Sequence, residues 1–156
     1  MSQEHQFILV SFDEYEEQGH DGFYLPAEDL SNIVLIHDDI IQYVQDTFNW
    51  IPSIIPDMNH QKRFGLCNYG TTILDKEGAK VISRLAKSWA DLFSNGPTTL
   101  KLTGNYGCIT INNGIPQGEY NLFEVDRDEL VKKFIKLQLF AEKVISSDYL
   151  ILHLGL

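Results

Sequence analysis

The first sixty residues of this 156-residue chain contain no lysine and no arginine, although they contain twelve aspartates and glutamates. The first basic residue is Lys62, and residues 61–156 carry the other ten acidic residues together with all twelve lysines and arginines. The formal net charge of −10 therefore originates in the first part of the chain. Such a field repels nucleic-acid phosphates and anionic membranes, and it attracts basic partners.

The chain is also poor in the residues that build disulfide or zinc sites. Its two cysteines, Cys67 and Cys108, are far apart and match neither a CxxC motif nor a zinc spacing with histidines. No apolar run is long enough to cross a bilayer, and the N-terminal residues lack the pattern of a secretory signal. We therefore expect a reduced, cytoplasmic protein that needs no metal or cofactor and binds neither nucleic acid nor a membrane.

The composition is that of one folded domain. The sequence is 44% hydrophobic and 12% aromatic, and its length suits a single domain with a substantial core. Because predicted helices and hairpin-connected strands are interspersed, we expect one α+β domain over residues 1–156. Its sheet should be mixed or largely antiparallel, with about three helices packed on it. The sequence does not define the strand order or the oligomeric state.

Apolar residues at helical spacing predict the three helices, each beginning near a capping aspartate. Asp38 or Asp39 can cap the first helix, and Asp126 with Glu129 resembles a capping box for the third. The predicted helices cover residues 38–49, 76–94 and 127–146.

Short β-prone runs predict the strands. The pair 99–103 and 108–112, separated by Gly104 to Gly107, indicates a hairpin. Residues 33–36 fit either a strand or the first turn of a helix, and the proline-containing segment 52–63 is interpreted as a long loop. The remaining predicted strands or extended segments are 6–12, 64–74, 121–125 and 149–156.

The acidic segment 13–22 is interpreted as an exposed loop that binds a protein partner. Its carboxylates and His20 also suggest a calcium site, but their spacing fits no EF-hand, so a solvated or partner-binding surface is favoured. Neighbouring aromatic residues provide candidate anchors for a partner. The predicted partner-binding residues are Asp13, Glu14, Tyr15, Glu16, Glu17, Asp21, Phe23 and Tyr24.

Three other features have both a chemical and a structural interpretation. His37, Asp38 and Asp39 together suit metal binding or acid–base chemistry, but aspartates at a helix start more often act as caps. His153 lies in a predicted strand, where a packed or hydrogen-bonded histidine is the commoner outcome. Cys67 and Cys108 lack a neighbouring histidine and are expected to be buried, inert thiols. No catalytic or metal residue is therefore assigned.

Residues 69–106 combine a Tyr-Gly-x-Thr opening, a helix ending in Trp-x-x-Leu-Phe and a Leu-x-Gly strand. Together with the closing residues 150–156, this pattern resembles a family of small bacterial proteins found among presumed immunity proteins of toxin systems. The resemblance rests on fold-forming residues, and it implies a protein that binds and neutralises a cognate toxin. Many such toxins attack nucleic acid with basic surfaces, which is consistent with an acidic inhibitor.

Two functional hypotheses follow. The first is a non-catalytic acidic protein that binds a basic protein partner, in the manner of an immunity protein. The alternative is a small metal-dependent or His/Asp-based hydrolase that uses His37, Asp38, Asp39 or His153. A deep pocket that collects these histidines and aspartates would favour the hydrolase.

Overall fold

The computed structural model describes residues 3–19, 30–56 and 59–156, with the side chains of residues 108–110, 112 and 116 also left undescribed. The helices in these ranges are α1 (Phe12–Gln18), α2 (Asp38–Tyr43), α3 (Gln45–Phe48), α4 (Lys76–Ser94) and α5 (Arg127–Ser146). The strands are β1 (Glu4–Ser11), β2 (Ile33–His37), β3 (Pro52–Ile55), β4 (Gln61–Phe64), β5 (Thr71–Leu74), β6 (Thr99–Asn112), β7 (Ile115–Asp126) and β8 (Tyr149–Leu154).

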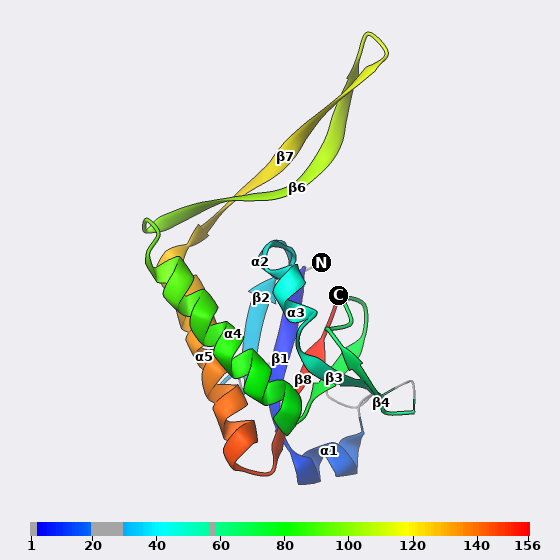
Figure 1. The fold of residues 1–156 in the computed structure, drawn as a ribbon, viewed down its shortest axis with the longest axis vertical. Helices are drawn as coiled ribbons and strands as arrows, with labels where there is room; N and C mark the ends of the chain where they lie inside the picture. Colours follow the sequence, from blue (N-terminus) through cyan, green and yellow to red (C-terminus); the bar gives the residue numbers. More distant parts are fainter. Residues whose placement is uncertain (1–2, 20–29, 57–58) are drawn as a thin grey trace.

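Six of these strands form one sheet in the order β2-β1-β8-β5-β3-β4, and every described pairing is antiparallel. The helices α4 and α5 lie side by side across one face of this sheet (Figure 1). The predicted α+β class with a largely antiparallel sheet is therefore confirmed. The strands β6 and β7 form a separate two-stranded sheet that projects away from the rest of the domain (Figure 1).

Two of the three predicted helices are confirmed, as α4 and α5. The predicted helix 38–49 is instead divided at Val44, which lies outside helical geometry at φ −107° and ψ 12°. The carbonyl of Val44 accepts hydrogen bonds from both the N–H and the hydroxyl of Thr47, three residues on, and this tightens the turn. No helix in the described ranges is both long enough and apolar enough to cross a bilayer.

The interpretation of residues 52–63 as a loop was wrong, because this segment contains β3 and most of β4. Alternate residues of β3 point inward: Ser53 and Ile55 are buried, while Ile54 is only partly buried. The Ser53 hydroxyl donates to the carbonyl of Gly65 at 2.6 Å, which satisfies a polar group inside the sheet. The ambiguous run 33–36 is a strand, β2.

The predicted hairpin turn at Gly104 to Gly107 was also wrong. The strand β6 continues through it, with a shift of register between Thr103 and Tyr106. The chain reverses at Asn113 and Gly114, whose φ angles of 52° and 77° are those that a tight two-residue hairpin turn requires. A local β-bulge therefore accounts for glycines that resembled a turn.

The main core lies between the sheet and the helix pair. An aromatic series crosses it, since Phe48 lies between Phe7 of β1 and Trp89 of α4, with ring centroids 6.3 and 4.9 Å away. Trp89 in turn lies 5.1 Å from Phe134 of α5, so the predicted core role of Trp89 is confirmed. A second buried cluster occupies the opposite face of the sheet and consists of Ile8, Val10, Ile33, Ile73, Leu150 and Leu152.

Close packing of α4 on β3 gives a stability prediction. A Cβ atom added at Gly78 would lie 2.4 Å from the backbone oxygen of Pro52, so the helix and the strand would have to separate. Alanine normally stabilises a helix interior by about 1 kcal/mol relative to glycine. We expect Gly78→Ala to lower the free energy of unfolding by about 1–3 kcal/mol instead.

Denaturant unfolding of both Gly78→Ala and Ser88→Ala measures this effect. Ser88 is exposed on the same helix, so its replacement should change stability by only a few tenths of a kcal/mol. A Gly78→Ala variant that is as stable as the parent chain would contradict the close packing.

Candidate functional site

The predicted acidic loop begins with a helix rather than a loop. Ser11 caps α1, because its hydroxyl accepts from the N–H of Glu14 while the Glu14 carboxylate accepts from the N–H of Ser11. This reciprocal capping box explains why a strongly acidic segment is helical. The predicted residues His20, Asp21, Phe23 and Tyr24 lie outside the described residues.

The four predicted acidic residues within α1 are all exposed, and the helix has no basic residue. Tyr15 is half-buried and packs against the second core cluster, so it holds the helix to the sheet. Of the predicted residues, the structure thus brings the five that it describes together on one short helix with a strongly negative outer surface. The exposed carboxylates belong to Asp13, Glu14, Glu16 and Glu17.

A pocket of about 550 Å³ lies against α1. The N–H of Phe12 donates to the carbonyl of Asp148 at 3.0 Å, which ties the start of α1 to the turn between α5 and β8. Residues at the start of α4 form another wall of the pocket. The described lining residues are Phe12, Asp13, Tyr15, Ile54, His60, Ile73, Asp75, Lys76, Asp148, Tyr149 and Leu150.

This pocket combines an apolar interior with an acidic margin. Aliphatic and aromatic side chains form more than half of the lining, and three carboxylates stand beside one ammonium group and His60. The ammonium of Lys76 lies 3.7 Å from the carboxylate of Asp148, so one negative charge is compensated. Such a site suits an apolar or long-stemmed cationic side chain of a partner. Sequence reasoning predicted Asp13 and Tyr15 here but missed Phe12, which is 48% exposed.

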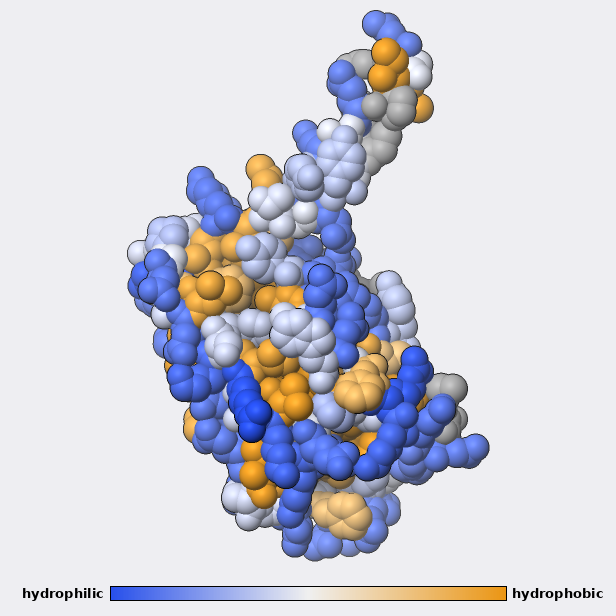
Figure 2. Space-filling view, in the orientation of Figure 1, coloured by the Kyte–Doolittle hydropathy of each residue, from blue (hydrophilic) through white to orange (hydrophobic). Residues whose placement is uncertain are grey.

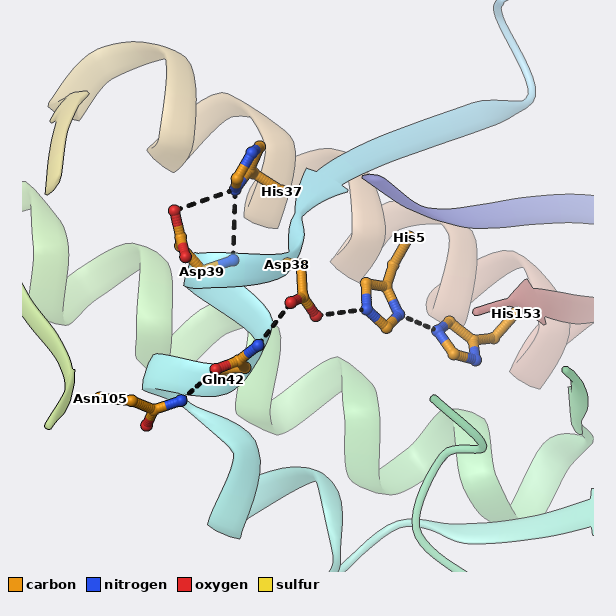
Figure 3. A network of polar contacts seen from close by, with 7 residues as sticks. All are labelled: His5, His37, Asp38, Asp39, Gln42, Asn105 and His153. Carbon is orange, nitrogen blue, oxygen red and sulfur yellow. Dashed lines mark hydrogen bonds and ion pairs between the residues drawn. The ribbon is translucent and has the colours of Figure 1, made fainter. Parts of the chain in front are cut away.

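A second candidate is a buried polar network that sequence reasoning did not anticipate. His5 of β1 and His153 of β8 are both fully buried, and the Nδ1 atom of His5 lies 2.9 Å from Nε2 of His153. The Nε2 atom of His5 lies 2.9 Å from the carboxylate of Asp38 (Figure 3). His5 thus connects His153 to the Asp38 carboxylate, and the prediction that His153 is packed or hydrogen-bonded is confirmed.

The Asp38 carboxylate at one end of the network determines which ring nitrogens of the two histidines carry a proton. The Asp38 carboxylate accepts from Nε2–H of His5, so the Nδ1 atom of a neutral His5 accepts from Nε2–H of His153. The remaining Nδ1 atom of His153 is then unprotonated, and it has no hydrogen-bond partner among the described residues. Burial, and secondarily repulsion from the His5 ring when that ring is protonated, lowers the pKa of His153 from 6.5 to about 3.

The network extends from the sheet to the projecting hairpin. Asp38 accepts a hydrogen bond from Gln42 of α2, and Gln42 accepts one from Asn105 of β6 (Figure 3). The buried histidines are thus connected through α2 to the base of the hairpin. The side-chain nitrogen of Gln42 donates to Asp38 and its side-chain oxygen accepts from Asn105, so both hydrogen bonds fix the orientation of this amide.

The residues proposed for a hydrolase are divided between two places. His37 is the actual cap of α2, because its Nδ1 accepts from the N–H of Asp39 at 3.2 Å, and this corrects the prediction that Asp38 or Asp39 is the cap. The His37 side chain is 48% exposed, whereas His153 is fully buried in the sheet. Neither His5 nor His153 is among the described residues that line the pocket.

The cysteines differ from expectation where they are described. Cys67 is a half-buried free thiol rather than a fully buried one, since it lies in the connection between β4 and β5. Its N–H donates to the hydroxyl of Thr72. The side chain of Cys108 is not described. Within the described ranges, no three His, Cys, Asp or Glu side chains are grouped so as to hold a metal ion.

Comparisons with models of known protein families, with curated proteins and with solved structures found no match to this chain.

The low pKa of His153 predicts a pH-dependent stability. Below pH 6.5 the unfolded chain protonates this imidazole, whereas the folded chain does so only near pH 3. The unfolded state therefore binds more protons in this window, and stability falls as the pH falls. The slope attributable to His153 is at most about 1.4 kcal/mol per pH unit.

Denaturant unfolding between pH 7.5 and pH 4.5 tests this prediction. His153→Gln should lack this component, so the difference between its stability and that of the parent chain should change steadily below pH 6.5. His60→Gln, which removes an exposed histidine, should leave the pH profile almost unchanged. Parallel profiles for the parent chain and His153→Gln would show that His153 does not titrate in this way.

Proposed function

We propose that this chain is a non-catalytic protein that binds and neutralises a basic protein partner, as an immunity protein does with its toxin. The observation that carries the proposal is the position of the apolar pocket directly beside the acidic helix α1. One region thus offers both a place for an anchoring side chain and a field that attracts a basic surface.

The charge distribution supports a basic protein as the ligand. Exposed carboxylates accelerate the encounter with a basic surface and compete with phosphate for it. Exposed charges add little affinity individually, about 0–1 kcal/mol for a surface pair. The pocket therefore has to supply most of the lasting affinity, by enclosing an apolar or long-stemmed basic side chain.

The bacterial toxin is the partner implied by the sequence resemblance described above. A toxin that acts on nucleic acid needs a basic groove, and an acidic protein seated on that groove would block it. The hydrolase alternative has less support, because two of the three members of the Asp38–His5–His153 network are fully buried. A substrate would have to displace part of the sheet to reach them.

The steering role of α1 predicts a kinetic effect. Replacing its four exposed acids with amides (Asp13→Asn, Glu14→Gln, Glu16→Gln, Glu17→Gln) should slow association by about tenfold or more at low salt. The effect should disappear at high salt, where screening removes the steering from the parent chain as well. The partner is first captured from the native host, and the association is then followed by surface plasmon resonance.

A matched control removes the same charge elsewhere. Glu119, Asp128, Glu129 and Glu142 are exposed on β7 and α5, so their conversion to amides changes the net charge equally. This control should associate nearly as fast as the parent chain. Equal slowing by both sets would mean that only the net charge matters and that α1 does not face the partner.

The anchoring role of the pocket predicts a different kinetic effect. Phe12→Ala should increase the dissociation rate at least tenfold, which corresponds to about 1.4 kcal/mol or more of binding free energy. Leu92→Ala is the control, because Leu92 is 63% exposed on α4 and does not line the pocket. If both variants dissociate like the parent chain, the pocket is not part of the interface.

A further inference from the structure

The β6–β7 hairpin projects well beyond the sheet and its helices (Figures 1 and 2). The hairpin is anchored near its base. Leu100 is buried, Leu102, Phe123 and Val125 pack partly against the main core, and Asn105 donates to Gln42 of α2. Beyond this base the ribbon carries large apolar side chains that are 59–75% exposed, which belong to Tyr106, Ile111, Ile115, Tyr120 and Leu122.

A two-stranded hairpin is at best marginally stable in water when nothing packs on it. In the described structure, neither β6 nor β7 pairs with a third strand, so each strand has an unpaired edge along its length. Exposed apolar side chains add to the cost of leaving this ribbon in solvent. Unpaired strand edges and exposed apolar side chains are the features expected of a hairpin that pairs with a strand of another protein chain.

The aromatic pair on the hairpin is already ordered for such a contact. The rings of Tyr106 and Tyr120 meet edge to face, with centroids 5.1 Å apart. Gly118 leaves room for this arrangement, since a Cβ atom there would lie 2.4 Å from the Tyr106 ring. Ordering before binding reduces the entropy lost on association.

The two strand edges differ in charge. Edges that avoid association are commonly protected by charged residues. β7 contains Glu119, Glu124 and Asp126, whereas β6 contains a single charged residue, Lys101 at its base, which pairs with Glu124 at 3.2 Å. The edge of β6 is therefore the unprotected one, and it has no uncompensated charge with which to recognise a basic partner.

We propose that the hairpin is a dimerisation arm, and that β6 pairs with β6 of a second copy of this chain. A two-fold axis makes the two strands antiparallel, so one strand edge is complementary to itself and the result is a four-stranded sheet. The charge distribution permits this occupant. β6 contains no acidic residue that would repel an identical strand, and the projecting arms keep the two acidic bodies apart.

This inference does not depend on the proposed function, and its salt dependence has the opposite sign. Binding of a basic partner to α1 weakens as salt screens attraction. Pairing of the arms should tighten as salt screens the repulsion between two bodies with a net charge of −10. The two kinds of association are therefore distinguishable in the same protein preparation.

Analytical ultracentrifugation of the purified full chain tests the proposal. We expect twice the 17.9 kDa chain mass at micromolar concentration, with a dissociation constant that decreases between 50 and 500 mM NaCl. The double variant Tyr106→Asp/Ile111→Asp adds two negative charges to each β6 strand, so the paired strands should repel each other and the dissociation constant should rise about 100-fold or more. Circular dichroism and thermal unfolding establish that the body of the variant remains folded.

The matched control is Leu92→Asp/Leu139→Asp, which makes the same kind of change at exposed positions of α4 and α5. This control should dimerise like the parent chain. A parent chain that sediments as a monomer at all concentrations up to 0.5 mM would overturn the proposal. The arm would then be a binding surface for a different protein. A dimer that is unaffected by the arm substitutions would overturn it as well.

Discussion

Pairing of β1 with β8 is the constraint on which the rest of the structure depends. It joins residues near the two ends of the chain at the centre of the sheet, from Gln6 opposite Leu154 to Ser11 opposite Tyr149. The same pairing brings His5 to His153 and places the start of α1 beside Asp148. Both candidate sites therefore arise from one strand register. A shift of either strand by one residue would place the two histidines on opposite faces of the sheet.

The two proposed interaction surfaces differ in chemistry and lie at opposite ends of the molecule. The acidic helix α1, which lines the pocket, lies at one end of the longest axis, and the tip of the hairpin lies at the other (Figure 1). A partner seated on α1 would thus leave the arm accessible. A dimer formed through the arms would present two acidic pockets facing away from each other, so both could be occupied at once.

The sequence predicted the elements whose signals are local, and it missed those that depend on distant residues. The apolar stripes of α4 and α5 and the β-prone runs of β1 and β8 were sufficient. The capping box of Ser11 with Glu14 and the Asn113-Gly114 turn were also present in the sequence but were not recognised. Nothing local predicts the contact of His5 with His153, because 148 positions separate them and only the sheet register brings them together.

The central position of β8 has a consequence for biosynthesis. Its neighbours β1 and β5 cannot be joined into one sheet until residues 149–154 have left the ribosome, so the sheet closes only after the preceding residues have emerged. During translation the edge of β1 that later pairs with β8 and the edge of β6 are both exposed. Until β8 has emerged, the nascent chain therefore carries unpaired strand edges, which are sites of aggregation.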